Sequence, residues 1–273
     1  ADLPRTGRRH PSMIVARTIA EIRGLPRSRG TRVGLVPTMG ALHAGHQSLF
    51  AAARAECDRV IASMFVNPTQ FDDAGDLARY PRDETRDAAL AAAAGVDVLF
   101  APAVSELYPD GFDTWVNPGE IATVLEGVFR PGHFRGVATV CLKLFHIVSP
   151  DVVYFGQKDA QQVEVIRRML RDLDLPIGLR VLPTVRDSDG LAISSRNARL
   201  SSDGRRRALA LPRALATRNP ERARALLEGL EIEYVAVAPF SPPVLAAAVR
   251  VDGVRLIDNV VLDEPEGHPA GGR

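Results

Sequence analysis

The 273-residue sequence has few cysteines, no long apolar run and no excess of charge of either sign. Cys57 and Cys141 form no C-x-x-C pattern, so we expect neither a disulfide framework nor a metal knuckle. No apolar run approaches the roughly 18 residues of a membrane span, and no signal-peptide pattern opens the chain. The charges of the 34 basic and 33 acidic side chains nearly cancel. The overall electrostatic field therefore does not favour nucleic acid or an anionic membrane as a partner. These absences fit a protein of the reducing cytoplasm.

The hydrophobic content, 46%, is enough for one large core, or for one large and one small core. Strand-like runs alternate with helical patterns, which predicts βαβ units and a parallel sheet covered on both faces. We therefore expect an α/β fold with a Rossmann-like domain. The predicted strands are 32–36, 60–66, 96–100, 152–155 and 178–184, and the predicted helices are 45–56, 83–94, 137–148 and 159–173.

The character of the sequence changes after Arg186, where a polar loop leads to two helical segments, 205–215 and 220–227. Three apolar runs end the pattern, and Asp252-Gly253 joins the last two, which is typical of a type I′ hairpin. These runs are 231–238, 244–251 and 254–261. We predict a disordered leader at 1–12, a Rossmann-like domain at 13–185, a small α+β lid at 186–263 and a polar tail at 264–273.

The most informative segment runs from an apolar strand, closed by Pro37, through a glycine turn to two histidines. Gly40 and Gly45 allow the backbone to approach a ligand, and a helix that starts near Gly45 would offer its N–H groups to an anion. His43 and His46 are three residues apart, so in a helix both rings leave the same side. The order of these features predicts a phosphate site.

Two other interpretations of this histidine pair remain. Each histidine could have a purely structural role, with its ring nitrogens hydrogen-bonded within the protein. A zinc site is the second alternative, but no third ligand follows at a matching spacing nearby. The strand, proline and glycine turn before the pair favour phosphate.

Polar residues follow other predicted strands. Asn67 and Gln70 come after the second strand, where their amides could bind a small polar substrate or serve the turn around Pro68. Lys158 and Asp159 open a helix, where the lysine could meet phosphate and the aspartate could cap the helix or hold a ribose or a metal-bound water. Taken alone, this segment is an ordinary capped helix start.

A hinge-like loop contains Ser194, Ser195 and Arg196, which could close over a polyphosphate or form a plain polar linker. Arg130 and His133 lie in a glycine-rich loop that carries little information by itself. Side chains that could bind phosphate thus occur in several separate loops. A purely structural role explains one such loop easily, but it explains their repeated occurrence less well.

The motifs together resemble the pantoate–β-alanine ligase (pantothenate synthetase) family of the H-x-G-H nucleotidyltransferase-like superfamily. The segments that carry the resemblance are 37–46, 65–71, 80–82, 130–134, 155–162 and 194–197. The resemblance spans residues 13–261 and implies a two-step reaction. ATP and pantoate give pantoyl adenylate and pyrophosphate, and the amine of β-alanine then releases AMP and pantothenate.

The resemblance also implies roles for residues. His46, as proton donor, would act in catalysis with His43, Lys158 and Arg196. Gln70 and Gln162 would bind pantoate, Gln70 also near β-alanine, and Asn67, Tyr80, Arg130 and His133 would complete the substrate site. The residues that would line ATP are Met39, Gly40, Ala41, Leu42, His43, Ala44, Gly45, His46, Gly156, Gln157, Lys158, Asp159, Val185, Ile193, Ser194, Ser195 and Arg196. Mg²⁺ would enter with the triphosphate, no metal site made by protein side chains is expected, and a homodimer is implied.

The sequence departs from the family pattern in several places, one of which is the acidic cluster after residue 82, thinned here to Asp83, Glu84 and Asp87. The family commonly has Glu, an aromatic residue and Met where Gln157, Ala160 and Ile193 stand, and the C-terminal domain is shorter between 215 and 231. A ligase of the same chemistry with another acid or amine therefore remains an alternative. A non-catalytic nucleotide- or tRNA-binding module is a second one, although the balanced charge argues against RNA.

Overall fold

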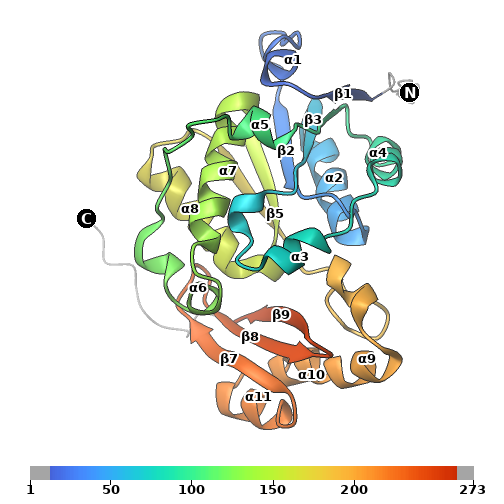
Figure 1. The fold of residues 1–273 in the computed structure, drawn as a ribbon, viewed down its shortest axis with the longest axis vertical. Coiled ribbons are helices and arrows are strands. Elements are labelled where there is room, and N and C mark those ends of the chain that lie inside the picture. The colour runs from blue at the N-terminus through green and yellow to red at the C-terminus, as the bar shows by residue number, and fades with distance from the viewer. Residues whose placement is uncertain (1–12, 263–273) are drawn as a thin grey trace, which may run out of the picture.

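The computed structural model describes residues 13–262, so the predicted leader and polar tail lie outside the described residues. Within that range the chain forms a six-stranded parallel sheet and a three-stranded antiparallel sheet (Figure 1). The strand order of the parallel sheet is β1 (Ile14–Ala16), β4 (Val98–Phe100), β3 (Arg59–Met64), β2 (Val33–Thr38), β5 (Val152–Gly156), β6 (Gly178–Leu182). The predicted α/β fold with a Rossmann-like parallel sheet is confirmed.

The order of the strands positions the site. The chain moves outward from β2 through β3 to β4, and then returns to the other side of β2 to add β5 and β6. The order therefore reverses between β2 and β5. Open α/β sheets bind ligands in the crevice beyond the carboxyl ends of the strands at such a switch point.

Helices cover both faces of the parallel sheet because its central strands are apolar on both sides (Figure 1). One face packs against α2 (Ala44–Glu56) and α4 (Glu84–Ala93). The other packs against α1 (Ile19–Arg23), α7 (His133–Val148) and α8 (Ala160–Asp172). The shorter helices in this part are α3 (Ala74–Ala78), α5 (Val104–Leu107) and α6 (Glu126–Phe129), with 3₁₀ turns η1 (Pro68–Gln70), η2 (Gly119–Ala122), η3 (Gln157–Asp159) and η4 (Ser195–Arg199).

The antiparallel sheet has the order β7 (Glu231–Ala238), β8 (Val244–Val251), β9 (Val254–Val261). Its outer face is covered by α9 (Ser202–Ala208), α10 (Ala210–Leu215) and α11 (Pro220–Leu226) (Figure 1). Alternate residues of β8 serve different cores: Leu245 and Ala247 pack against these helices, whereas Val244 and Ala246 belong to the core of the parallel sheet. The small sheet therefore packs against the larger part through its inner face.

The predicted C-terminal strands are observed with the predicted bounds. Asp252 and Gly253 have φ of +52° and +72°, as both central residues of a type I′ turn require. The segment 205–215, predicted as one helix, is instead two helices that meet at Leu209. Pro212 explains the break, because it has no N–H to donate to the carbonyl four residues earlier.

Other boundaries also differ from the predictions. Strand β2 continues through Pro37 to Thr38, in register with Ser63 and Met64 of β3. Helix α7 begins at His133 rather than at residue 137, directly after Gly132 with φ of +81°. Strand β1 has three residues and escaped prediction because so short a run has no readable period.

Candidate active site

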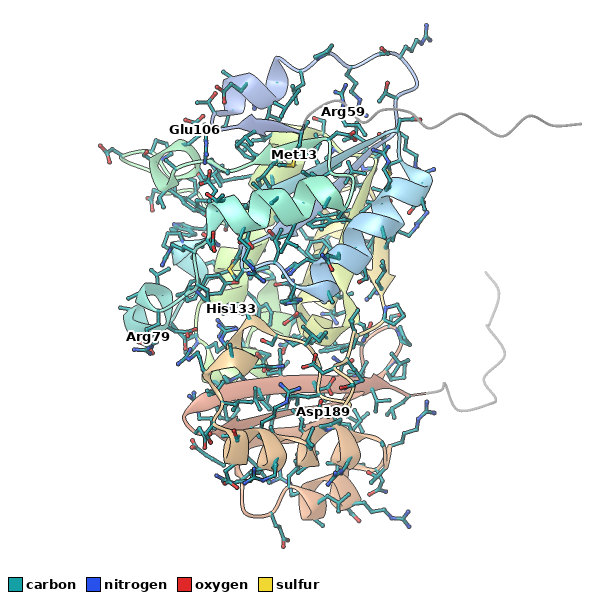
Figure 2. The ribbon with its side chains drawn as sticks, turned by 90° about the vertical axis from the view of Figure 1, so that its right-hand side faces the viewer. Met13, Arg59, Arg79, Glu106, His133 and Asp189 are labelled. Atoms are coloured by element: carbon teal, nitrogen blue, oxygen red, sulfur yellow. The ribbon has the colours of Figure 1, made fainter. Side chains whose placement is uncertain are left out.

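A cleft of about 1220 Å³, its open mouth included, lies beyond the carboxyl ends of β2 and β5. His133 lies in the region between the parallel sheet and the C-terminal sheet in Figure 2, and it lines this cleft. The cleft brings together most of the predicted site residues: Met39, His43, His46, Asn67, Gln70, Tyr80, Arg130, His133, Gly156, Lys158, Asp159, Gln162, Ile193, Ser194, Ser195 and Arg196. It does not include Gly40, Ala41, Leu42, Ala44, Gly45, Gln157 and Val185 among its lining residues.

The turn between β2 and α2 is held by a buried carboxylate that the sequence did not indicate as functional. Gly40 and Ala41 both have positive φ, +79° and +50°, so the backbone turns sharply here. Asp87 of α4, 1% exposed, accepts the N–H groups of Ala41 and Leu42 at 2.6 and 2.9 Å. These N–H groups are therefore engaged with the protein. Asp87 stands in the first turn of a helix, where an acidic residue needs no further explanation.

His43 and His46 lie side by side, with ring centroids 4.1 Å apart, but for a different reason from the one predicted. His43 is the N-cap of α2, with extended backbone, and its Nδ1 accepts the N–H of Gly45 at 3.1 Å. Nδ1 of His46 accepts the N–H of His43 at 3.3 Å. The rings thus cap the helix reciprocally, as Ser and Glu do in a capping box.

This capping engages two of the N–H groups that the start of α2 was expected to offer to an anion. The N–H of Gly45 is taken by the His43 ring, and the N–H of His46 donates to the carbonyl of His43 at 2.9 Å. What faces the cleft instead is the pair of imidazole rings.

The hydrogen bonds assign the tautomers. A neutral imidazole that accepts at Nδ1 carries its proton on Nε2, so each of the two rings has one N–H donor left. Burial, together with the charges of nearby groups such as Lys158, lowers the pKa of His43 to about 4. Burial, reinforced by His43 and Lys158, lowers the pKa of His46 to about 3. Both rings are therefore neutral hydrogen-bond donors at neutral pH.

Asn67 orients Gln70. The buried Asn67 donates through Nδ2 to Oε1 of Gln70 at 3.1 Å and to the carbonyl of Gly136 at 3.2 Å. Because the amide oxygen of Gln70 is occupied in this way, its Nε2 is the group on the side of Met39, with Sδ 3.1 Å away. A Cβ at position 136 would lie 2.4 Å from the carbonyl oxygen of Thr69, so only glycine lets α7 approach the η1 turn this closely.

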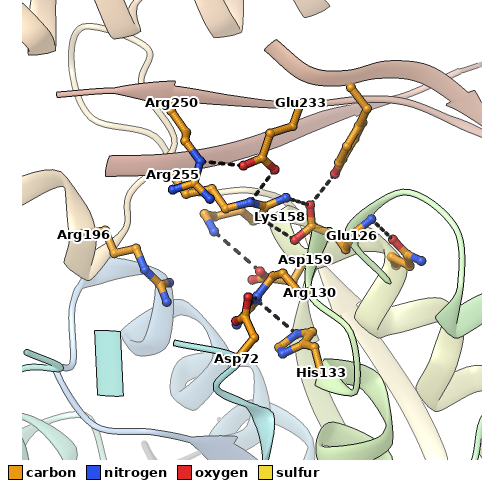
Figure 3. Close-up of polar contacts among 12 residues, drawn as sticks. Asp72, Glu126, Arg130, His133, Lys158, Asp159, Arg196, Glu233, Arg250 and Arg255 are labelled. Atoms are coloured by element: carbon orange, nitrogen blue, oxygen red, sulfur yellow. Dashed lines mark hydrogen bonds and ion pairs between the residues drawn. The ribbon is translucent and has the colours of Figure 1, made fainter. Parts of the chain in front are cut away.

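His133 and Arg130 both contact the backbone carbonyl of Gln70, and Figure 3 shows the hydrogen bond between their side chains. Nδ1 of His133 lies 2.8 Å from the carbonyl oxygen of Gln70, so it must donate, which leaves Nε2 to accept from Nη1 of Arg130 at 3.2 Å. Burial and the charge of Arg130 lower the pKa of His133 to about 4. Arg130 also pairs with Asp72 at 3.4 Å. Both ring nitrogens of His133 thus have protein partners.

The η3 turn brings Lys158 into the cleft, with Nζ 3.6 Å from Asp159 Oδ1 (Figure 3). The side chain of Gln157 points elsewhere, because its Nε2 donates to Oδ1 of Asn259 in the C-terminal sheet at 3.0 Å. Its predicted place along ATP is therefore not supported by the lining of the cleft. Val185, also outside the lining, accepts the N–H of Ile193 at 3.0 Å.

The loop that was predicted to clamp a polyphosphate forms the opposite wall. Oγ of Ser194 accepts the N–H of Arg196 at 3.3 Å and caps the η4 turn. Tyr80 is buried, which raises its pKa, and its hydroxyl is hydrogen-bonded to Ser195. The guanidinium of Arg196 is 2.8 Å from Asp76 of α3.

Sequence reasoning missed the apolar wall of the cleft. Val137, Val140, Cys141 and Leu144 follow one another at helical spacing on α7 and line the cleft. That spacing is equally typical of the core-facing stripe of an amphipathic helix, and no periodicity separates a core contact from a pocket wall. Burial raises the pKa of the Cys141 thiol to about 12, so it contributes as an apolar group.

Within residues 13–262, no group of three or more His, Cys, Asp or Glu side chains is arranged to hold a metal ion. In the same part of the chain, no helix is long and apolar enough to cross a membrane.

Comparisons with known proteins agree with the geometry. The model of the pantoate-beta-alanine ligase family matches residues 14–261. A pantothenate synthetase of Moorella thermoacetica is 50% identical, over 92% of this chain and 99% of that protein. The crystal structure of pantothenate synthetase from Thermus thermophilus is 44% identical, with a TM-score of 0.85 over 91% of this chain and 99% of that one. A pantoate-beta-alanine ligase from Francisella tularensis, solved with beta-gamma ATP and beta-alanine, is 38% identical, with a TM-score of 0.81 over 91% of this chain and 97% of that one. The chain therefore belongs to the pantoate–β-alanine ligase family.

Proposed function

We propose that this cleft carries out the ATP-dependent ligation of pantoate and β-alanine, and that the residues around it have the roles given below. The observation that carries the proposal is the meeting of two sets of groups in one cleft. One set consists of groups that can donate hydrogen bonds to phosphate, and it comes from three segments: His43 and His46, Lys158, and the loop at 194–196. The amides of Gln70 and Gln162 line the same space. Family membership names the reaction, and this arrangement suits it.

In the first step a carboxylate oxygen of pantoate attacks the α-phosphorus of ATP, and the bond from that phosphorus to the bridging oxygen breaks. Negative charge grows on the departing pyrophosphate, so donors already fixed in place stabilise the transition state more than the ground state. We assign this work to the Nε2–H groups of His43 and His46 and to Lys158. Because His46 is neutral at neutral pH, we propose that it donates a hydrogen bond from Nε2–H to the leaving group and keeps its proton, in place of the proton transfer that the family resemblance implies.

The acid itself would be recognised by two kinds of surface. The amide Nε2 of Gln70, on the cleft side because Asn67 holds its oxygen, would donate to a carboxylate or hydroxyl oxygen, and Gln162 would do the same from α8. Val140 and Leu144 on α7 would face the quaternary carbon of pantoate and its two methyl groups. His133 and Arg130 would act by holding the backbone of Gln70.

The second step needs little more from the protein. The amine of β-alanine attacks the acyl carbon, and the bond from that carbon to the phosphate oxygen breaks to release AMP. A mixed anhydride is reactive enough that holding the amine beside it supplies much of the acceleration.

Mg²⁺, assembly and location complete the proposal. Mg²⁺ would enter with the triphosphate, and the half-exposed carboxylate of Asp159, beside Lys158, would be available to contact a water molecule bound to it. We propose a cytoplasmic homodimer, in line with family membership and with Cys57 and Cys141 being free and buried. A division near residue 186 into a nucleotide-binding domain and a lid is supported by the separate core of the C-terminal helices.

The test is an assay of purified protein with ATP, Mg²⁺, pantoate and β-alanine. Pyrophosphate release should require ATP and pantoate, and formation of pantothenate should require all three substrates. Release of AMP that does not depend on both organic substrates would contradict the assignment.

A larger acid is the second candidate substrate, and Ala160 favours it. A side pocket of about 440 Å³ adjoins the cleft, shares Lys158 and Gln162 with it, and is bordered by Ala160, Phe134 and Phe240. A larger side chain at position 160 would reduce this space. A panel of hydroxy acids separates the two candidates, because clear preference for pantoate removes the alternative.

A further inference from the structure

The backbone that carries Lys158 is held by a side chain of the C-terminal sheet. Asn259 of β9 is 4% exposed, and its Nδ2 donates to the carbonyl oxygens of Gln157 and Lys158, both at 2.9 Å. One amide nitrogen thus uses both of its protons on consecutive carbonyls of the η3 turn. This contact joins a strand of the small sheet to the turn at the end of β5.

The orientation of the Asn259 amide is fixed by its neighbours. Its Oδ1 accepts from Nε2 of Gln157 at 3.0 Å, so the oxygen faces Gln157 and the nitrogen faces the two carbonyls. The reverse orientation would place an oxygen against two carbonyl oxygens. Asn259 and Gln157 therefore form a reciprocal pair with one stable arrangement.

The strand behind Asn259 is itself anchored. The backbone N–H of Asn259 donates to Oδ1 of Asp258 at 2.8 Å, and Asp258, 2% exposed, is bound by both terminal nitrogens of Arg186 at 2.6 and 3.0 Å. Bidentate pairs of this kind restrict direction as well as distance. The amide of Asn259 is thus presented from a rigid support.

The two carbonyls that Asn259 binds belong to the peptide planes on either side of the Lys158 Cα. A peptide group is planar and joined to the chain on both sides, so a hydrogen bond to its carbonyl oxygen restrains the orientation of the whole plane. With both flanking planes restrained, the φ and ψ of Lys158 and the direction of its Cα–Cβ bond are restrained as well. The position of the ammonium group in the cleft then depends mainly on rotation within the side chain.

From these contacts we infer that Asn259, oriented by Gln157, is a positioning residue that aims Lys158 at the leaving pyrophosphate. The inference rests on the proposed function, which gives Lys158 its role. It also gives Gln157 a role outside the nucleotide site: its side chain serves the lysine through Asn259.

The experiment compares Asn259→Ala with a matched control, Tyr234→Phe. The hydroxyl of Tyr234 donates to Glu126 at 2.6 Å, so the control also removes a hydrogen bond between the C-terminal sheet and the larger part of the protein, but it leaves residues 157–159 untouched. We expect Asn259→Ala to lower kcat for pyrophosphate release about tenfold or more, with ATP affinity changed far less, while Tyr234→Phe stays within about threefold of the parent. Thermal unfolding of both variants monitors the fold.

A double variant tests whether the effect passes through the lysine. In the background of Lys158→Ala, adding Asn259→Ala should cost little further activity, because the group that it positions is already gone. Gln157→Ala, at a half-exposed position, is a milder variant that keeps Asn259 but frees its amide to turn, and it should lower kcat by an intermediate factor.

Equal kcat values for Asn259→Ala and Tyr234→Phe would overturn the inference. So would an undiminished loss when Asn259→Ala is added to Lys158→Ala, since that result would show an effect independent of the lysine. Should the parent protein release no pyrophosphate from ATP and pantoate, the proposed function itself fails, so the two failures are distinguishable.

Discussion

The guanidinium of Arg196 and the carboxylate of Asp76 lie 2.8 Å apart, in a second pocket that shares Lys158 and Arg196 with the cleft. Arg199 shares the same carboxylate at 3.0 Å. Burial opposes ionisation of Asp76, but the hydrogen bonds and charges of the two arginines lower its pKa overall. A triphosphate that binds Arg196 must therefore compete with an ionised carboxylate already in place.

Removing that competitor should strengthen nucleotide binding. We expect Asp76→Asn to lower the Kd for MgATP by about two- to fivefold, the effect of releasing a partly exposed ion pair. Asp73→Asn is the control, because Asp73 caps the same helix but pairs with Arg79, at 3.7 Å, and not with Arg196. Isothermal titration of each variant decides the matter. Weaker binding by Asp76→Asn would mean instead that Asp76 holds Arg196 in its binding orientation.

His46→Ala tests the histidine pair. Loss of a fixed donor to the leaving group should slow pyrophosphate release by about 10² or more, as for other donors of this kind. His146→Ala, on the exposed end of α7, should leave the rate unchanged. A rate for His46→Ala within a few-fold of the parent would remove His46 from its proposed role.

The three histidines that line the cleft predict how stability depends on pH. Their folded pKa values, about 4 for His43, about 3 for His46 and about 4 for His133, lie below the ordinary value of 6.5. The unfolded chain therefore takes up protons first, so the stabilisation is complete above pH 6.5 and is lost as the pH falls from 6.5 towards 4.

Urea unfolding between pH 7.5 and 5 measures this loss. The free energy of unfolding should fall more steeply for the parent than for His46→Ala, by up to about 1.4 kcal/mol per pH unit for the one proton removed. Parallel curves for the two proteins would show that His46 is protonated as readily in the folded state as in the unfolded chain.

The sequence predicted the parallel sheet, and it predicted that most candidate site residues meet at one edge of that sheet, because both depend on local signals. The end of β2 is indicated by an apolar run, a proline and two glycines that follow one another in the sequence. The carboxyl ends of neighbouring parallel strands then lie at the same edge of the sheet. The strand, proline and glycine turn singled out His43 and His46, and their spacing predicted that the rings lie together. Their reciprocal capping of α2 was not predicted, because a histidine at the N-cap is not the residue that capping rules lead one to expect.

What escaped prediction depends on contacts between distant segments. Nothing in the sequence pairs Asn259 with Gln157, or Arg196 with Asp76, since the partners are more than a hundred positions apart and each is an ordinary polar residue in its own segment. The polar loop at 194–196 predicted a clamp, but which anion its arginine meets is decided by the packing of α3. Position in the fold, rather than residue type, distinguishes such side chains.

Asp87 gives the sharpest test of how the glycine turn is held. In Asp87→Ala the N–H groups of Ala41 and Leu42 lose their acceptor inside the protein, and leaving buried donors unpaired costs about 1–3 kcal/mol each. We expect a loss of about 2–4 kcal/mol in the free energy of unfolding and, because this turn leads directly into His43, a lower rate of pyrophosphate release.

Asp83→Ala, on the same helix, is the matched control. Asp83 is the N-cap of α4 and accepts the N–H of Arg86 at 3.0 Å, so its removal should cost only about 1 kcal/mol and leave the rate nearly unchanged. Chemical unfolding and the pyrophosphate assay on both variants separate the two effects. Equal losses of stability and rate would mean that Asp87 acts only by starting α4, whereas a larger loss confined to Asp87→Ala ties the carboxylate to the turn that presents the histidines.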